Sequence, residues 1–280
     1  MKKHFFLFKN ITKTLVVSSI IFMSCGSKND GPIIQSRDET KKEPEIDSPV
    51  FNSTDPLFPN SITSTSIDFI KTSDPDAFLS IKYIGQARKE MPGNDSDDIF
   101  DDKTYVFEAS FLNDKKVQIW AHSSFGSVNI AQDYATKLTG PLGKLPCLMR
   151  DKLGHVVLQK GNGTNSSEDA GGFIILFSDK VDTRIMNNDL EETVFHESAH
   201  VAFDIPYSKS ANTWKQLQNK DKGNFITAYA KSFADREDIA ESALFAYTMI
   251  KYPGRLSPEV EEWVKTNIPN RYNFFKPIFN

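Results

Sequence analysis

Two histidines with a glutamate between them form the stretch of this sequence whose chemistry is clearest. His196-Glu197-Ser198-Ala199-His200 places both imidazoles on one face of a helix, because residues four apart lie on the same side. Zn²⁺ binds imidazole nitrogen well, and a catalytic zinc site typically has three protein ligands and a water. Glu197 is not needed as a ligand and is placed to act as a general base for that water. The pattern predicts a zinc metallopeptidase whose third ligand lies elsewhere.

A helix over about residues 189–203 must position these side chains. Asn188 or Asp189 fits the N-cap of a capping box, and acidic residues fill the first turn, where the helix dipole favours them. His196 and His200 share one face of this helix. Three apolar residues form a packing face: Leu190, Val194 and Val201. We therefore expect one side of the helix to be buried and the histidines to face a cleft.

The third ligand is expected from a second helix, which opens at residues 236–242 and extends to about Lys251. Glu237 and Glu241 lie four residues apart on it and share a face. One carboxylate could complete the zinc ligands while the other holds a ligand histidine by its second ring nitrogen. Four neighbouring residues are apolar, so both glutamates are expected to face inward: Ala240, Ala243, Leu244 and Phe245.

These patterns together resemble the gluzincin metallopeptidases. The order His-Glu-x-x-His, a tyrosine-alanine pair and Glu-Asp-x-Ala-Glu is similar to the catalytic domain of anthrax-lethal-factor-like peptidases. The resemblance extends from Thr193 to Phe245 and leaves the N-terminal half unaccounted for. It implies that Tyr229 stabilises the developing oxyanion, although the chain has an extra residue between Tyr229 and Glu237 compared with the lethal-factor pattern.

Carried over residue by residue, the resemblance assigns the remaining roles. It implies that His196, His200 and Glu237 are the zinc ligands. It also implies that Glu197 is the general base and that Glu241 supports a ligand from outside the metal's immediate shell. Peptides or proteins would be the substrates, and Zn²⁺ would be the cofactor.

Other residues fit a metal site less well. The metzincin pattern needs a glycine and a histidine where Phe203 and Pro206 stand. Asp204 lies one turn beyond the second histidine and is interpreted as a helix-end residue. His122 and His155 each stand alone in a strand context, which favours surface or structural roles.

The N-terminus resembles the signal of a bacterial lipoprotein. Four lysines and no acids precede an apolar run over residues 15–23 that is too short to span a bilayer, and Ser24-Cys25-Gly26 follows it. We expect residues 1–24 to be a signal peptide and Cys25 to be lipidated, which places the protein in the bacterial cell envelope, attached to a membrane. The alternative is an ordinary secreted protein with an incidental cysteine.

Charge and cysteine content restrict the partners. The chain has 33 basic and 37 acidic residues, and removal of the four lysines before Cys25 leaves 29 minus 37, a net charge of −8. Nucleic acid is therefore not expected as a partner. Cys147 is the one thiol besides Cys25, so lipidation excludes an internal disulfide. We expect a monomer.

Residues 25–60 are polar and charged and contain several prolines, so we interpret them as a disordered tether. Residues 61–280 are expected to form one α+β, zincin-like domain with a small mixed sheet and a helical C-terminal part. Upstream of the histidines the sequence predicts five features: a helix over 75–90, with a strand not excluded; a solvated loop, rather than a calcium loop, over 95–102; strands over 104–111 and 116–121; a helix over 128–138; and a hairpin of 148–150 with 155–159.

The polar loop 160–169 and the apolar strand 172–177 precede the histidine helix. We expect the loop to border the cleft and the strand to be an edge strand that pairs with an extended substrate. Ser257 is a clear N-cap for a helix to about Thr266, and the aromatic tail after it should pack on the domain.

A different class of function is a cell-envelope lipoprotein that binds a partner and has a structural or vestigial zinc site. The presence of Glu197 favours the peptidase, since a structural zinc site uses four protein ligands and needs no base.

Overall fold

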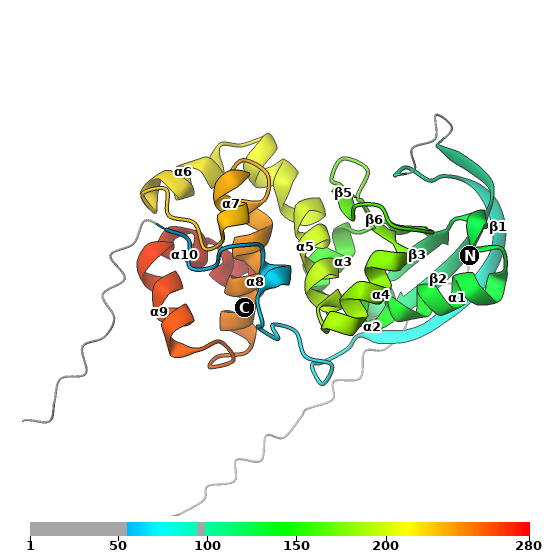
Figure 1. Ribbon diagram of the computed structural model, residues 1–280, viewed down its shortest axis with the longest axis horizontal. Helices are drawn as coiled ribbons and strands as arrows, with labels where there is room; N and C mark the ends of the chain where they lie inside the picture. The colour runs from blue at the N-terminus through cyan, green and yellow to red at the C-terminus, as the bar shows by residue number, and fades with distance from the viewer. Residues whose placement is uncertain (1–54, 94–98) are drawn as a thin grey trace, which may run out of the picture. The chain divides into compact units, whose positions relative to one another are not determined.

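A six-stranded mixed sheet forms one part of the protein in the computed structural model, which describes residues 55–93 and 99–280 (Figure 1). In spatial order its strands are β1 (Phe78–Glu90), β2 (Phe100–Phe111), β3 (Lys116–Ala121), β4 (His155–Gln159), β6 (Phe173–Phe177) and β5 (Ser166–Glu168). The first three strands are antiparallel, β4 is parallel to β3 and β6, and β5 is antiparallel to β6. The outermost strands are therefore β1 and β5.

The two faces of the sheet follow from the alternation of side chains along each strand. Ile174 and Leu176 of β6 point into the main core, whereas Ile175 and Phe177 point to the opposite face. There they pack with Met91 and residues of β4 in a second, smaller cluster. Because both faces of this strand are covered, every position in it is apolar.

The helices lie on the main-core side of the sheet and beyond it. Four helices precede the histidines: α1 (Val128–Lys137), α2 (Thr139–Lys144), α3 (Cys147–Lys152) and α4 (Ser178–Asn187). Then follow α5 (Leu190–Phe203), α6 (Thr213–Lys220), α7 (Ala228–Ser232), α8 (Asp238–Lys251), α9 (Pro258–Asn267) and α10 (Pro269–Phe279). Figure 1 shows α5 between the sheet and the later helices, and it contacts β5 and β6 on one side and α8 on the other. Short turns of helix are η1 (Ile62–Ser64), η2 (Leu112–Asp114), η3 (Ser123–Phe125) and η4 (Asp204–Lys209).

The predicted α+β class is confirmed, and so are several of its elements. The strand pair over 104–111 and 116–121 is the antiparallel pair of β2 and β3. The predicted helices correspond to α1, α5, α8 and α9, and Ser257 caps α9 by accepting a hydrogen bond from the Val260 amide. The aromatic tail forms α10, whose Phe275 and Phe279 are buried in the core.

Of the two structures left open over residues 75–90, the helix is wrong and the strand is confirmed, because β1 spans Phe78–Glu90. It pairs with β2 from Phe78 opposite Phe111 to Glu90 opposite Phe100. The register shifts at three places along this pairing. Each shift interrupts the alternation of side chains, so the apolar residues fall at intervals that imitate a helix.

The predicted hairpin of 148–150 with 155–159 is also wrong. Residues 147–152 form α3, and the Arg150 guanidinium donates to the carbonyls of Leu142, Gly143 and Leu145. β4 pairs in parallel with strands far away in the sequence, which a local pattern cannot predict.

The acidic run 95–102 is only partly described, since residues 94–98 lie outside the described residues. Its end begins β2, and Asp101 is buried and accepts hydrogen bonds from the Ser123 amide and hydroxyl at 2.7 and 2.8 Å. The expectation of a solvated loop is therefore wrong for Asp101, which holds η3 against the sheet.

α5 is more deeply buried than the sequence predicts. All its residues except Glu191 and His196 are buried, because the sheet and α8 enclose it. The predicted capping box is not formed: Asn188 ends α4 in a left-handed conformation, and the side chain of Asp189 pairs with Arg184 at 2.9 Å.

The predicted signal peptide, Cys25 and most of the predicted tether lie outside the described residues. Phe58, near the end of that tether, forms a β-bridge with Thr227. All described residues belong to one compact unit. Within this described part, no helix has both the length and the apolar character that a membrane span requires.

A buried ionic group fixes the first turn of α8 against the C-terminal helix. Arg271 of α10 is fully buried and donates to both carboxylate oxygens of Asp238 at 2.7 and 2.8 Å and to Asp221 at 3.0 Å. Trp214 and Gln218 of α6 also donate to Asp238. One buried guanidinium thus binds two buried carboxylates, and Trp214 and Gln218 are further donors to one of them.

We predict that Arg271→Ala lowers the free energy of unfolding by about 3–5 kcal/mol, because it leaves two buried carboxylates without their cation. Urea denaturation of the two proteins measures this difference. Lys265→Ala is the matched control, since the Lys265–Glu261 ion pair of α9 is exposed and its loss should cost below about 1 kcal/mol. Equal effects of the two substitutions would contradict the prediction.

Candidate metal centre

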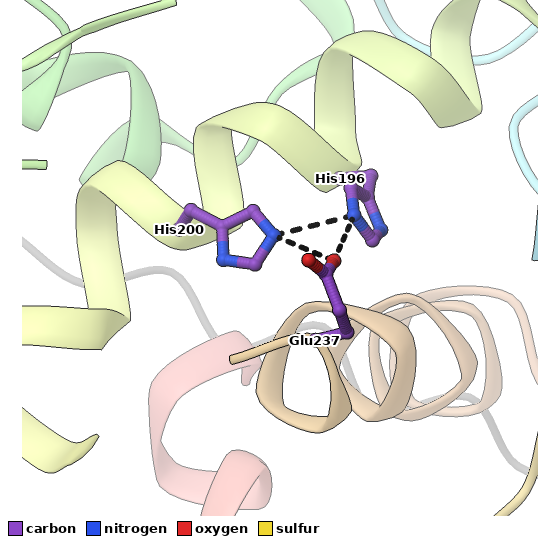
Figure 2. A group of neighbouring side chains, drawn as sticks. All are labelled: His196, His200 and Glu237. Carbon is purple, nitrogen blue, oxygen red and sulfur yellow. Dashed lines mark hydrogen bonds and ion pairs between the residues drawn. The ribbon is translucent and has the colours of Figure 1, made fainter. Parts of the chain in front are cut away.

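Three side chains from two helices meet at one point. Nε2 of His196 and Nε2 of His200 lie 3.2 and 3.3 Å from Oε2 of Glu237, and 3.2 Å from each other. Figure 2 shows both imidazoles projecting from α5 toward the Glu237 carboxylate, which lies at the start of α8. The three groups each offer one ligand atom, and these atoms lie within 4.8 Å of one another. This group could hold a metal ion.

Two local features of the backbone produce this convergence. The one-turn spacing of His196 and His200 aligns their rings on the side of α5 that faces α8. Glu237 is the N-cap residue of α8, but its side chain makes no capping hydrogen bond and is directed at the histidines. The next residue, Asp238, is fixed by Arg271, so the buried ionic group also fixes the backbone that carries Glu237.

The second ring nitrogen of each histidine faces another carboxylate. Nδ1 of His200 lies 3.0 Å from Oδ2 of Asp204, and Nδ1 of His196 lies 3.6 Å from Oε1 of Glu241, which is longer than a hydrogen bond. The Asp204 carboxylate at Nδ1 of His200 favours the tautomer that carries its proton there, so that a neutral His200 directs its Nε2 lone pair at the shared point. The resemblance anticipated this position for Glu241.

Asp204 is the residue that the sequence interpretation missed. It was expected only to end the helix, and it does begin η4 directly after α5. Yet it is buried and bonded to His200 as well. The signal was its position four residues after His200, which places the two side chains on the same face of a continuing helix.

Burial and hydrogen bonding act in opposite directions on the charged groups here. Burial disfavours the ionised form of Glu237, but hydrogen bonds from His196 and His200 outweigh it and hold its pKa well below the usual range. Burial also disfavours protonation of His200, yet its bonds to Asp204 and Glu237 raise its pKa to about 10. In the absence of an ion, a proton on His200 thus compensates the charge of Glu237. A metal would have to displace that proton.

Several polar atoms at the site are buried without a hydrogen-bond partner in the described part of the chain. They are Nδ1 of His196, Oδ1 of Asp204 and Oε1 of Glu241. Native proteins have few such atoms, and each one needs an explanation. All three surround one pair of histidines, which is the pattern of a functional site, where stability is reduced for the sake of function.

Glu197 and Tyr229 lie beside the three clustered residues. Glu197 is buried, and burial raises the pKa of its carboxyl even though the two histidines oppose this effect. It is hydrogen-bonded to Ser167 of β5. Burial and the neighbouring Glu237 raise the pKa of Tyr229 to about 12, and its hydroxyl is bonded to that carboxylate. The phenol therefore stays protonated at neutral pH and can donate a hydrogen bond.

Two cavities border the cluster. One has a volume of about 270 Å³ and the other of about 340 Å³, and both are lined by His196, Glu197 and Tyr229. Thr164 and Asn165 also line both, so the prediction that the loop 160–169 borders a cleft is confirmed.

The expectation that residues 172–177 form an edge strand is wrong. β6 lies inside the sheet, between β4 and β5. β5 is the edge strand on this side, and its Ser166 and Ser167 line the larger cavity. The polar loop that precedes β6 turns back and adds this short strand, which covers the apolar one. His155, in turn, stacks between Trp120 and Phe173, which bears out a structural role.

Comparison of the chain with protein-family models, with curated proteins and with solved structures finds no match. The resemblance to gluzincins therefore depends on the residues and their geometry.

We predict that Asp204→Ala weakens binding of Zn²⁺ by about 10- to 100-fold, because His200 loses the partner that orients its ring. Titration against a chromophoric chelator measures the affinity. Asp235→Ala is the matched control, since it removes the same side chain from an exposed ion pair with Lys215. Unchanged zinc affinity in a folded Asp204→Ala protein would contradict the role of this residue.

Proposed function

We propose that this protein is a zinc-dependent metallopeptidase that hydrolyses peptide bonds. One observation carries the proposal: His196, His200 and Glu237 converge at a point that borders two cavities, with a buried glutamate next to them. Two histidines and one glutamate are a ligand set of catalytic zinc sites. A structural zinc site is instead closed by four protein ligands. Within residues 55–93 and 99–280, the group has three.

The donor set fits Zn²⁺. Both Nε2 atoms and one carboxylate oxygen already face a common point, and Asp204 and Glu241 lie at the opposite ring nitrogens. When bound there, a zinc ion lowers the pKa of water to about 7 and polarises a carbonyl group. Everything else that the reaction needs must come from the side chains around it.

Glu197 is the proposed general base. Its raised pKa matches the task, because a base whose pKa is closer to neutrality both accepts a proton from water and returns it to the leaving amine. Ser167 holds its carboxylate by a hydrogen bond, so its orientation is fixed by the edge strand. The burial of Glu197 limits competing contacts with bulk water.

Tyr229 is the proposed donor to the carbonyl oxygen as negative charge develops on it. It lines both cavities and thus lies next to any peptide that extends between them. A phenol with a raised pKa keeps its proton while it donates this hydrogen bond. The hydroxyl is bonded to Glu237 here, so it would exchange one oxygen acceptor for another when substrate binds.

β5 offers a place for an extended peptide. An edge strand has unpaired main-chain groups that can bond to a substrate backbone, and Ser166 and Ser167 of this strand border the larger cavity. The proposal therefore places the substrate along β5, with the bond to be cut over Glu197.

The proposed location is the bacterial cell envelope, with Cys25 lipidated and the chain attached to a membrane by it. This part of the proposal is supported by the lysine-rich start, the short apolar run and the cysteine that follows it. A protein or peptide that reaches the same membrane surface would be the substrate.

We predict that Glu197→Gln abolishes peptide cleavage and leaves zinc binding unchanged. The substitution keeps the size of the side chain but removes the proton acceptor, and Glu197 is not one of the three converging groups. The measurement combines metal analysis with digestion of a peptide library, before and after removal of zinc with a chelator.

The same experiment separates the peptidase from a lipoprotein with a structural or vestigial zinc site. If the zinc-loaded wild-type protein cuts nothing and removal of zinc only lowers the melting temperature, the site is structural. If Glu197→Gln cuts as well as the wild type, the proposed mechanism is wrong even though the protein is a peptidase.

We predict that Tyr229→Phe lowers kcat by about 10²-fold, the usual loss for one donor to an oxyanion, without an equal change in KM. The loss arises because the ring stays in place while the donor is removed. Steady-state kinetics on a cleaved peptide provide the measurement. Tyr83→Phe on β1 is the matched control, since Tyr83 packs on Phe107 away from the cluster. A normal kcat in Tyr229→Phe would assign the oxyanion to another group.

A further inference from the structure

Two positive side chains of α4 help to line the smaller of the two cavities at the cluster. Lys180 and Arg184 both line it, and they lie one turn apart on α4, so they share the face of that helix that borders the cavity. Five further lining residues are polar and uncharged: Ser61, Thr63, Thr164, Asn165 and Thr193. The remaining ones lie at the metal centre or beside it: His196, Glu197, Tyr229 and Glu241.

Among the described residues, no partner compensates the charge of Lys180. Over residues 55–93 and 99–280 its ammonium group forms no ion pair or hydrogen bond, although the cavity partly encloses the side chain. Arg184 is bound to Asp189 at 2.9 Å through Nη1 alone. The two acidic residues of this helix are engaged by other groups: Asp182 is bound to Lys137 and Tyr134, and Asp179 accepts a hydrogen bond from the Ser178 hydroxyl at 3.1 Å. A cation without a partner in a polar cavity is a site for an anion.

The two carboxyl groups in the lining are engaged with other residues. Glu241 accepts a hydrogen bond from the Ile62 amide at 3.0 Å and faces His196. Glu197 is bonded to Ser167 and lies beside both histidines. The lining therefore combines carboxyl groups that lie beside the histidines with two cations that come from α4.

The size of the cavity indicates what kind of anion fits. A volume of about 270 Å³ is below the range of about 300–1,000 Å³ that is usual for sites of whole small-molecule ligands. It suits one side chain of a longer substrate. Threonine and asparagine groups in the lining can donate further hydrogen bonds to a carboxylate.

We propose that this cavity is a carboxylate subsite, in which Lys180 and Arg184 bind an acidic side chain of the substrate next to the bond that is cut. The proposal rests on the proposed peptidase function for the identity of its ligand as a peptide. It names the class of substrate: peptides with a glutamate or aspartate near the cleavage point. A free C-terminal carboxylate has the same chemistry and is the other source that the test must separate.

Binding to the Glu197→Gln protein tests this subsite without any need for cleavage. The probes are fluorescent peptide mixtures of equal length with random flanking positions and an amidated C-terminus, whose central residue is fixed as glutamate in one and glutamine in the other. Zinc-loaded Glu197→Gln protein should bind the glutamate mixture about tenfold more tightly by fluorescence anisotropy, the scale of one hydrogen-bonded charge pair. A third mixture has the central glutamine and a free C-terminal carboxylate.

Substitutions added to the Glu197→Gln protein identify the cation. Lys180→Ala should remove most of the preference for glutamate, and Lys180→Arg should keep it. Lys265→Ala on α9 is the matched control and should change nothing, because Lys265 pairs with Glu261 on an exposed surface. Lys180 is not held by any ion pair in the described residues, so its loss leaves the fold intact.

Equal binding of the glutamate and glutamine mixtures, with no preference for the free C-terminus either, would overturn the proposal. A preference for the free C-terminus that Lys180→Ala removes would keep the carboxylate subsite and assign it to the end of the substrate chain. Cleavage by the wild-type protein is a separate result. Cleavage without a glutamate preference in binding rejects the subsite alone, whereas a glutamate preference without cleavage rejects the peptidase function alone.

Discussion

The contact between α5 and α8 is the constraint on which the rest of the structure depends, because it buries charged groups that only one arrangement can compensate. Burial of an isolated charge costs several kcal/mol, and a partner in good geometry recovers most of that cost. His200 lies between Asp204 and Glu237, and His196 lies between Glu237 and Glu241. A shift of α8 by one residue along α5 would leave these groups unpaired. The site and the helix packing are therefore the same interaction.

The C-terminal helices stabilise this contact by holding the first turn of α8 in place. Asp238 follows Glu237 directly, and Arg271, Trp214 and Gln218 all donate to its carboxylate. α10 also buries Phe275 and Phe279 against α5 and its neighbours. A buried ion pair is weak evidence for stability, but it specifies geometry strongly because a misplaced partner is costly. We interpret the aromatic tail and Arg271 as the support that fixes the position of the third converging residue.

The sequence predicted what is encoded within one helical turn. Two pairs of residues four apart predict two helices and the side on which each faces the other. The pairs are His196 with His200 and Glu237 with Glu241. Features that depend on packing between distant segments were missed. β1 imitates a helix because of its register shifts, and the edge position of β5 arises from a polar loop that folds back on β6.

The same limit applies to the site itself. Lys180 and Arg184 carry no local signal as a site, since two basic residues one turn apart are usually an exposed helix face. They become candidates for a binding site only because α4 packs beside α5 and both helices line the same cavity. The position of Asp204, four residues after His200, already allowed a contact between the two side chains, but the helix was expected to end there. The continuation as η4 keeps it in reach.

The balance of charge at the cluster supports the proposal that it holds a dication. Four carboxyl groups surround two imidazoles: Glu197, Asp204, Glu237 and Glu241. Without an ion, His200 takes up a proton, and burial raises the pKa of both Glu197 and Glu241, which reduces the excess of negative charge. A divalent cation at the shared point would stabilise the ionised forms of all four, including the base. In the proposed mechanism, the carboxylates attract the metal ion, and the charge of that ion keeps Glu197 ionised and able to accept a proton.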